Sequence, residues 1–547
     1  MLSLGVAMII VDATIVNVAV PSIARELGLS GTTTQWINTI YALVFAAFLV
    51  TMGRLGDRVG RRKMYLGGLA LFLFASVLAG FAPSGEALIG ARFLQGLGGA
   101  AILPATQSIL NENFRGRERA IAFGIWGSVI GGMAALGPLI GGWLTTYLSW
   151  RWAFYVNVPV GLLAIVGTMM WIDESCDENA RGGFDPFGFV FVTLGLGSIV
   201  FGLIEGYTYG WTAPSAPLEL FGWHWPLTSV SIIPFAVVFG FALLVAFAVV
   251  EIRRERAGKF FLFDFGLWKY PAFRYGNLAG SIVSLGEFGL LFALPLFLQA
   301  VLGMSAAQVG LTILALAIGA FFAAPTSAPL SNRFGARRVV TLGMGLEALG
   351  IFITTLLLSR TLNVLFLVPP LFVYGLGVGF SSAQLTSIVL ADVPTEMSGL
   401  ASGTNSMLRQ IGSALGIAIL GSALFVSLGV GTGDRLAKIP GMPPAAQVAV
   451  RQAIEGSAGQ ALIGFRTGVV DPAVAGKLGG NIDPATLGAL GKAVAPPIED
   501  AFVDAARLAG FVATGFVLLG LVFSLLLPKE KPRAVVVDQE AAAVAIA

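Results

Sequence analysis

Gly53-Arg54-Leu55-Gly56-Asp57-Arg58-Val59-Gly60-Arg61-Arg62-Lys63 is a short basic segment between two long apolar runs. Two apolar helices joined by so short a segment must lie antiparallel, and the charged joint cannot sit in hydrocarbon. Five cations in eleven residues mark the cytoplasmic side, because short loops rich in Lys and Arg stay inside the cell. The stretch therefore predicts a membrane protein with this joint in the cytoplasm.

A second basic joint, Leu330-Ser331-Asn332-Arg333-Phe334-Gly335-Ala336-Arg337-Arg338, repeats the pattern 275 residues further along the chain. The repeat indicates a duplicated membrane protein. The two copies differ where Asn332 replaces Asp57. A charge lock at the second joint must therefore be weaker or use another anion.

The composition places most of the chain in lipid. Of its 547 residues 56% are hydrophobic and only 12% are charged, whereas soluble domains carry about 25% charged residues. The net charge of +3 is small and the basic residues lie in short loops. This pattern argues against a nucleic-acid partner and favours a chain whose basic loops set its orientation in the bilayer.

Cysteine and histidine are too rare for a metal centre. The single Cys176 excludes an intramolecular disulfide and a cysteine cluster, and the lone His224 excludes a multi-histidine site. No metal site and no cofactor are predicted.

The first apolar run has Asp12 in its middle and no basic region before it, so we predict a retained helix rather than a signal peptide. Because this run begins at Met1, we expect a start further upstream or a trimmed cytoplasmic tail.

A membrane span needs about 20 apolar residues, and the chain holds about fourteen such segments. Their approximate limits are 2–20, 35–53, 64–82, 86–110, 120–143, 153–172, 186–206, 229–250, 273–298, 306–330, 339–358, 364–390, 400–428 and 504–527. Alternating sides place the basic clusters in cytoplasmic loops, and the outer loops carry little beyond Arg25 and Arg360. Both termini are therefore expected in the cytoplasm.

The duplication predicts two six-helix bundles with two further helices inserted between them. The expected parts are a first bundle at 1–172, the inserted helices within 173–250, a cytoplasmic interfacial linker at 251–272, a second bundle at 273–528 and a cytoplasmic tail at 529–547. A long loop, 429–503, is periplasmic by parity, with short helices predicted around 444–455 and 484–494. It is either a loose outer loop or a regulated cap over the exit.

Several stretches resemble signatures of one family. They are Asp12-Ala13-Thr14-Ile15-Val16-Asn17-Val18-Ala19-Val20-Pro21, the basic joint, Ala91-Arg92-Phe93-Leu94-Gln95-Gly96-Leu97-Gly98-Gly99-Ala100, the run Gly127 to Gly142 with Gly137-Pro138, and Trp150-Arg151-Trp152-Ala153-Phe154 followed by Asn157 and Pro159. In this order they resemble the fourteen-helix drug:proton antiporters (DHA2 type) of the major facilitator superfamily. The resemblance implies an all-α integral membrane protein with the major facilitator fold.

The same resemblance implies a function. It implies alternating access between two rocking bundles and export of hydrophobic or cationic small molecules, driven by the proton gradient with no cofactor. The location implied is the bacterial inner membrane, and we expect a monomer. The leading alternative is a dedicated proton-coupled exporter of an endogenous metabolite, lipid or peptide. A membrane enzyme is disfavoured because no catalytic set is visible, and a sensor because no soluble domain is attached.

Acidic residues within the spans are the candidates for proton coupling. Asp12 lies nine residues before Pro21, roughly 13 Å at about 1.5 Å per residue, which is near the middle of the membrane. An ionised carboxylate there costs about 2.5–3.5 kcal/mol, and burial favours its protonated form. Such a group can take a proton from one side and release it to the other. The alternative is a structural hydrogen bond within the bundle.

Glu287 and Glu347 are isolated mid-span anions of the second bundle, and we predict coupling or cation binding for both. Glu287 is the stronger candidate because its helix corresponds to the first helix of the first bundle. Glu205 is expected at a solvated helix end.

A buried guanidinium needs a carboxylate or carbonyl groups for its donors, and the family resemblance implies that Arg92 tunes proton transfer near the first helix.

The basic joint and the fifth span are candidates for conformational control. Gly53, Asp57, Arg58 and Arg62 are predicted to latch the bundles in one state, with topology alone as the alternative for the arginines. In the fifth span Gly131, Gly137, Pro138 and Gly141 form a stripe of small residues around a proline. Such a stripe permits close packing, and the proline permits bending. Tight packing without motion is the alternative.

Aromatic residues near the seam are candidates for cavity walls that hold a lipophilic cation against ring faces. The set is Trp36, Tyr41, Trp126 and Phe288. Most aromatic residues in such a chain face lipid or other helices instead.

Overall fold

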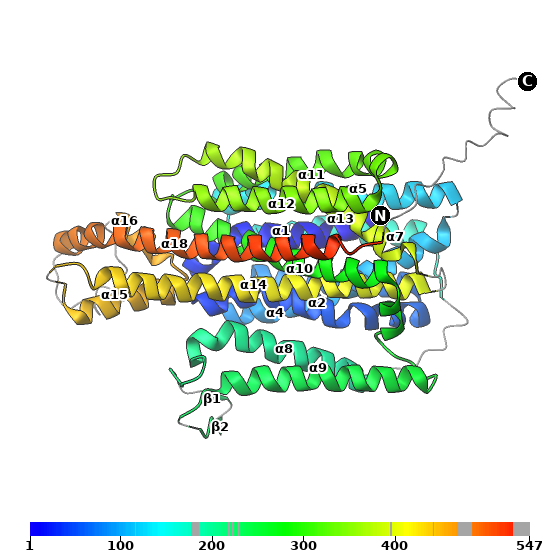
Figure 1. The fold of residues 1–547 in the computed structure, drawn as a ribbon, viewed down its shortest axis with the longest axis horizontal. Coiled ribbons are helices and arrows are strands. Elements are labelled where there is room, and N and C mark those ends of the chain that lie inside the picture. The colour runs from blue at the N-terminus through cyan, green and yellow to red at the C-terminus, as the bar shows by residue number, and fades with distance from the viewer. Residues whose placement is uncertain are drawn as a thin grey trace, which may run out of the picture.

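The computed structural model describes residues 1–114, 116–176, 185–216, 219–220, 223–227, 229–393, 397–440, 442–467 and 484–528. Its elements are long helices that run nearly parallel to one axis (Figure 1). One short antiparallel pair, β1 (Glu219–Leu220) and β2 (Trp223–His224), lies at the left-hand end of the molecule in this view. The described residues therefore form a helical membrane fold, as predicted.

The first half supplies seven helices. They are α1 (Leu2–Leu27), α2 (Gly31–Val59), α3 (Arg61–Gly80), α4 (Gly85–Asn113), α5 (Gly116–Tyr147), α6 (Trp152–Tyr155) and α7 (Asn157–Trp171). The sixth predicted span is thus divided into the short α6 and the longer α7. Side-chain oxygens begin two of these helices, because Ser30 accepts a hydrogen bond from Thr33 N and Ser84 accepts one from Ala87 N.

The remaining helices form the insertion and the second half. They are α8 (Pro186–Tyr209), α9 (Ile232–Arg256), η1 (Phe265–Lys269), α10 (Pro271–Ala300), α11 (Ala306–Phe334), α12 (Ala336–Leu357), η2 (Val364–Leu367), α13 (Val368–Ala391), α14 (Ser398–Leu436), α15 (Pro444–Gly456), α16 (Ala461–Thr467) and α18 (Pro484–Ser524). Thirteen helices of the described chain are long and apolar enough to cross a membrane. They do not include α5, a helix of 32 residues at the place of the fifth predicted span.

The two basic joints have the same backbone geometry. A shift of 275 residues carries the end of α2 onto the end of α11, and the start of α3 onto the start of α12. A single glycine separates the helices in each case, Gly60 with φ of 119° and Gly335 with φ of 87°. Residues with a β-carbon rarely adopt such angles, so a glycine is what allows each pair of helices to turn within one residue.

Helix packing repeats between the halves. In the first half α2 and α3 both pack on α4, and α1 packs on α5 and α7; in the second, α11 and α12 pack on α13, and α10 packs on α14 and α18. The halves meet where α5 packs on α11 and α2 packs on α14. We keep the boundaries at 1–172 and 273–528 as a proposal on the basis of this repeated packing.

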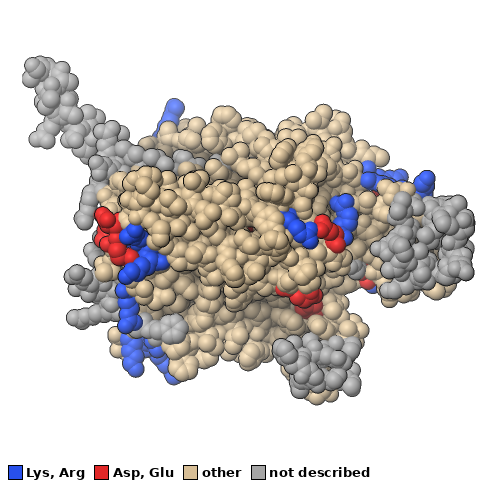
Figure 2. All heavy atoms as spheres, turned by 180° about the vertical axis from the view of Figure 1, so that it is seen from behind, with Lys and Arg blue, Asp and Glu red and all other residues tan. Residues whose placement is uncertain are grey.

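The inserted helices α8 and α9 pack on each other, and α8 also contacts α2 and α14. Figure 1 shows the pair along one side of the molecule. The start of α1 and the end of α18 lie at the opposite end from α15 and α16 (Figure 1). Charged side chains gather toward two ends of the face shown in Figure 2, with a broad uncharged belt between them. This distribution fits a chain embedded in lipid.

The linker 251–272 packs partly into the protein. Phe263 and Leu267 are buried, and the linker's place at the membrane interface stays a prediction. Glu251, itself buried, accepts hydrogen bonds from the backbone N–H groups of Leu262 (2.6 Å) and Phe263 (2.8 Å). These two bonds fold the linker back against the end of α9.

The loop predicted at 429–503 is shorter than expected at both ends. Helix α14 continues to Leu436, and α18 begins at Pro484, so the second short helix predicted there is the start of α18. An ion pair between Arg435 and Asp504 links the extended parts of α14 and α18. Between them, α15 packs on α14 and α16 packs on α18. Residues 468–483 lie outside the described residues.

Glu251→Ala is expected to lower the thermal unfolding temperature of the purified protein. The change leaves the Leu262 and Phe263 N–H groups without their acceptor, and each buried donor left unpaired costs about 1–3 kcal/mol. Thermal unfolding in detergent measures the effect. The matched control is Arg253→Ala, an exposed residue of the same helical turn; equal unfolding temperatures for the two variants would show that Glu251 does not hold the linker.

Candidate functional site

A buried ion pair lies at the centre of the first half. A nitrogen of the Arg92 guanidinium on α4 donates to the carboxylate of Asp12 on α1, and the two side chains are 1% and 0% exposed. Gln95 Nε2 donates to Asp12 Oδ1 at 3.1 Å, and Asn157 Nδ2 donates to the same oxygen at 2.9 Å. Both amides also donate to the Ser76 hydroxyl. We call these five residues the first polar centre.

The first polar centre connects four helices, α1, α3, α4 and α7. Arg92 and Gln95 are three residues apart and therefore lie on one face of α4. The guanidinium lies 4.2 Å from the ring centroid of Tyr41, and its Nε donates to the carbonyl of Ile37 at 3.2 Å. Tyr41, predicted as a cavity aromatic, is thus covered by Arg92 and almost fully buried.

Three members of this centre were not predicted to have a role. Gln95 and Asn157 stood within quoted family signatures, and Ser76 stood outside them. Their common feature is a polar side chain within an apolar run, since a buried polar group needs a partner. A search for such residues would have found them, but only the fold shows that they converge on Asp12.

The second half holds a different arrangement. Glu287 on α10 lies 275 residues after Asp12, the same shift that relates the basic joints. Glu287, Glu347 on α12 and Arg409 on α14 are close enough to interact electrostatically, and Tyr374 on α13 also feels both carboxylates. We call these four residues the second polar centre.

The acids of the second polar centre are less completely paired than Asp12. Glu347 is 0% exposed, and its carboxylate makes no close hydrogen bond within the described part of the chain, where Ser381 and Arg409 are the polar neighbours that interact with it. The buried Tyr374 hydroxyl is also without one there. Glu287 is half-buried. Arg409 donates to the Ser382 hydroxyl at 3.4 Å rather than making a close ion pair of the Asp12–Arg92 kind.

Helix α5 of the first half packs on α1 of its own half and on α11 of the second half. A β-carbon at Gly137 or Gly141 would come within about 3 Å of atoms of α1, and one at Gly142 would lie 2.4 Å from the Ala306 carbonyl oxygen of α11. On the facing helix, a β-carbon at Gly310 would lie 2.3 Å from the Pro138 carbonyl oxygen. The predicted glycine stripe is therefore a close contact on two sides. The surroundings of Gly131 are not among those that the structure describes.

Hydrogen bonds join the halves in their predicted outer part. The Thr146 hydroxyl of α5 accepts from the Ala307 N–H at the start of α11, at 2.8 Å. Gln299 of α10, 1% exposed, donates to the Val18 carbonyl of α1 at 3.0 Å. On the other seam, Ser422 of α14 contacts the amide oxygen of Gln35 at 3.3 Å.

The basic joint is held by an anion that was not predicted. The Glu174 carboxylate accepts from the backbone N–H groups of Arg62 (3.1 Å) and Lys63 (3.2 Å) at the start of α3. Negative charge is favourable at a helix N-terminus, where N–H groups are unpaired. Gly60 leaves the space for this carboxylate, because a β-carbon there would lie 2.5 Å from its oxygen.

The other residues of the joint have different surroundings. The Arg62 guanidinium donates to the Met169 carbonyl at 2.8 Å, and Arg61 forms an ion pair with Glu112 on α4. Gly53 packs against Pro104 of α4. Arg58 is exposed. The Asp57 side chain, the predicted latch, lies outside the described residues.

The remaining candidate aromatic residues are Trp36, Trp126 and Phe288. Trp36 donates its indole N–H to Glu205 of α8 at 3.0 Å, so Glu205 has a protein partner rather than only the solvated helix end we expected. Trp36, Tyr41 and Trp126 pack in one apolar cluster, and Phe288 packs against another. Three of the four predicted aromatics therefore lie in one cluster of the first half, and their role as a cavity wall stays a prediction.

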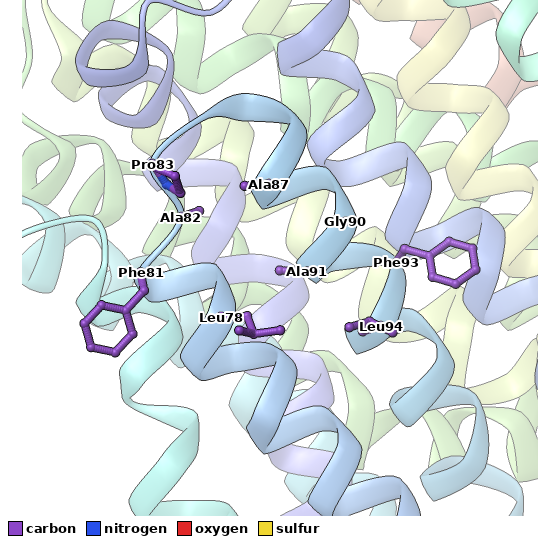
Figure 3. Close-up of a pocket in the computed structure, with 9 residues that line it drawn as sticks. All are labelled: Leu78, Phe81, Ala82, Pro83, Ala87, Gly90, Ala91, Phe93 and Leu94. Carbon is purple, nitrogen blue, oxygen red and sulfur yellow. The ribbon is translucent and has the colours of Figure 1, made fainter. Parts of the chain in front are cut away.

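A shallow apolar groove lies between α3 and α4 and is shown in Figure 3. Small residues such as Ala87 and Gly90 line it, and the rings of Phe81 and Phe93 point away from it on opposite sides (Figure 3). Phe81 is 72% exposed. The groove therefore belongs to the outer surface of the first half and not to the seam between halves. In the described part of the chain no three His, Cys, Asp or Glu residues cluster as a metal site would require.

Comparison with known proteins agrees with this architecture. The sequence model of the Major Facilitator Superfamily matches residues 2–186 and 186–417. The probable actinorhodin transporter of Streptomyces coelicolor is 35% identical over 433 residues, which are 77% of this chain and 71% of that protein. The multidrug resistance protein Stp of Mycobacterium tuberculosis is 33% identical over 422 residues, 77% of this chain and 74% of that protein.

Solved structures give the same fold. A bacterial homologue of the human lysosomal transporter Spinster, inward-facing and unoccupied, has a TM-score of 0.59 and 18% identity, with 97% of both chains covered. The human organic anion transporter MFSD10 has a TM-score of 0.55 and 12% identity, with 96% of this chain and 97% of that chain covered. At these identities the likeness concerns the fold alone.

Asp12→Asn is expected to destabilise the protein strongly, because it leaves the buried Arg92 charge without a carboxylate. Breaking a buried ion pair on one side costs about 3–5 kcal/mol. The double variant Asp12→Asn/Arg92→Gln should recover part of this loss, since no unpaired charge remains. Thermal unfolding measures both, with Glu205→Gln as the control acid. A double variant no more stable than the single one would contradict the role given to the pair.

Gly142→Ala is expected to reduce transport severalfold, because the new β-carbon must push the backbones of α5 and α11 apart. Gly90→Ala is the matched control, since a β-carbon there meets nothing within 4 Å. The rate of dye efflux from cells expressing equal amounts of each variant gives the comparison. Similar rates for the two variants would mean that the α5–α11 contact is not needed for transport.

Proposed function

Because this chain belongs to the Major Facilitator Superfamily, we propose that it exports hydrophobic or cationic small molecules in exchange for protons by alternating access. The chain is a multi-pass transport protein of the bacterial inner membrane and not an enzyme. Its relatives include the multidrug efflux pump LfrA of Mycolicibacterium smegmatis, 33% identical over 77% of this chain and 79% of that protein. That these relatives are named for multidrug resistance and efflux supports the substrate class proposed here.

The observation that carries the proton-coupling proposal is the contrast between the two polar centres. Asp12 is ion-paired and accepts two further hydrogen bonds, so its negative charge is compensated where it lies. Glu347 is equally buried but makes no close hydrogen bond among the described residues. An ionised carboxylate in that position loses its hydration and has mainly the shared Arg409 to offset the cost. We therefore assign proton uptake to Glu347 and Glu287 rather than to Asp12.

Arg409 gives the second polar centre a means of coupling. A cation between two acids favours the ionised form of whichever carboxylate lies nearer. A change in the spacing of α10, α12 and α14 would therefore change which acid holds a proton. In this scheme Arg92 and Asp12 keep the first half rigid, and a lipophilic cation competes with protons for the half-buried Glu287.

Alternating access is assigned to the two seams. The contacts of Gly142, Thr146, Gln299 and Gln35 lie in the predicted outer part of the chain, which we take as closed in this conformation. The basic joint, with Gly53, Asp57, Arg58 and Arg62, is retained as the proposed latch of the inner side. Glu174 is added to it because its carboxylate fixes the start of α3. We propose a monomer that needs no cofactor beyond the proton gradient.

A dedicated exporter of one natural product is the second candidate. Relatives named for single compounds favour it, among them the tetracenomycin C resistance and export protein of Streptomyces glaucescens, 31% identical over 83% of this chain and 80% of that protein. A panel of exported compounds separates the candidates, since a dedicated exporter would move one member and ignore the rest.

Glu347→Gln is expected to abolish proton-driven export while leaving substrate-for-substrate exchange intact, because glutamine mimics the protonated acid but cannot release a proton. In inverted vesicles, wild-type protein should dissipate a pre-formed proton gradient when ethidium is added, and the variant should not. Glu205→Gln is the control. A flat wild-type response across dyes, quaternary ammonium compounds and lipids would contradict antiport, and a fully active Glu347→Gln would remove Glu347 from the proton path.

A further inference from the structure

A cleft of about 680 Å³ lies at the predicted outer end of the chain, apart from both polar centres. Its walls come from the start of α2, the end of α8 with the turn after it, the outer part of α14, and α15. We call it the outer cleft. Pockets that hold drug-sized molecules measure about 300–1,000 Å³, so its size suits a compound of that class.

Aromatic side chains from three segments line the outer cleft, namely Tyr207, Trp211 and Phe425. Two glycines make room for them: a β-carbon at Gly206 would lie 2.8 Å from the Trp211 ring, and one at Gly31 would lie 2.9 Å from the Phe425 ring. Trp211 is 43% exposed although it packs on Gly206. The cleft therefore offers ring surface to a flat apolar molecule.

The polar groups of the outer cleft carry no uncompensated charge. Arg451 and Glu455 are the charged residues among those that line it, and Arg451 Nε donates to Glu455 Oε1 at 2.6 Å. The Tyr207 hydroxyl lies close enough to interact with both members of this pair. The hydrogen bond that Arg451 donates to Glu455 raises the pKa of Arg451, so the guanidinium stays charged and lies against its carboxylate partner. Ser30, Thr32 and Gln35 add neutral hydrogen-bonding groups.

We propose that the outer cleft is an exit-side binding site for an uncharged aromatic compound with hydrogen-bonding groups at its edge. Ring faces and neutral polar groups suit such a molecule, whereas a lipophilic cation would have to compete with Arg451 for Glu455. The site rests on the proposed export function.

The position of the outer cleft gives it a part in the transport cycle. Helix α2 belongs to the first half, and α14 and α15 belong to the second. Rocking of the halves must therefore change the width of the cleft. The inserted helix α8 forms a further wall, which gives the α8–α9 insertion a role in substrate handling.

Cysteine protection tests the site. In a Cys176→Ser background, Trp211→Cys and, independently, the rim variant Thr212→Cys are purified in detergent and treated with a charged maleimide. Nile red, an uncharged aromatic dye, should slow labelling of both severalfold, and tetraphenylphosphonium should not. Lys438→Cys is the control, an exposed outer residue that does not line the cleft.

Each outcome of this experiment decides one point. Protection by Nile red at Trp211→Cys or Thr212→Cys, with none at Lys438→Cys, supports the site. No protection at either position, or equal protection at the control, overturns it, and equal protection by tetraphenylphosphonium overturns the ligand class. Labelling needs no proton gradient, so it is independent of the vesicle assay. A flat vesicle response across dyes, quaternary ammonium compounds and lipids would remove the proposed function even if protection were seen.

Discussion

The Asp12–Arg92 ion pair is the interaction on which the first half of the structure depends. A lone charge in the middle of a membrane protein is expensive, so each member of the pair makes the other tolerable. The amides of Gln95 and Asn157 complete the coordination of the carboxylate, and Tyr41 covers the guanidinium. Four helices are thereby fixed to one buried point. A movement of any one of these helices would disturb the ion pair.

The second half has an acid at the corresponding place, but its carboxylate is less completely paired than that of Asp12. Glu287 follows Asp12 by the shift that relates the two basic joints, yet Arg409 is shared between it and Glu347, and Glu347 makes no close hydrogen bond among the described residues. A group that is poorly compensated in one conformation is sensitive to small movements of its neighbours. Under the proposed mechanism, duplication followed by this divergence separates a structural acid from titrating acids.

Close contacts of α5 join it to helices of both halves. Helix α5 touches α1 through Gly137 and Gly141 and touches α11 through Gly142. Without a hydrophobic driving force in lipid, helices associate through such close packing. The Gly142 contact with α11 is made by backbone atoms, whereas the seam of α2 and α14 also carries the inserted helix α8 and the outer cleft.

The sequence by itself determined the class of fold, the membrane location and the duplication, because apolar length, basic loops and a repeated joint are local properties that need no contacts to be recognised. It also located Asp12, Glu287, Glu347 and Arg92 as polar residues where polarity is costly. Only the tertiary structure decided which of these acids is compensated, that Glu174 caps α3, and that α8 shares a cleft with α15. These outcomes depend on which side chains meet across helices that are far apart in the chain, and no periodicity along one helix records its partners.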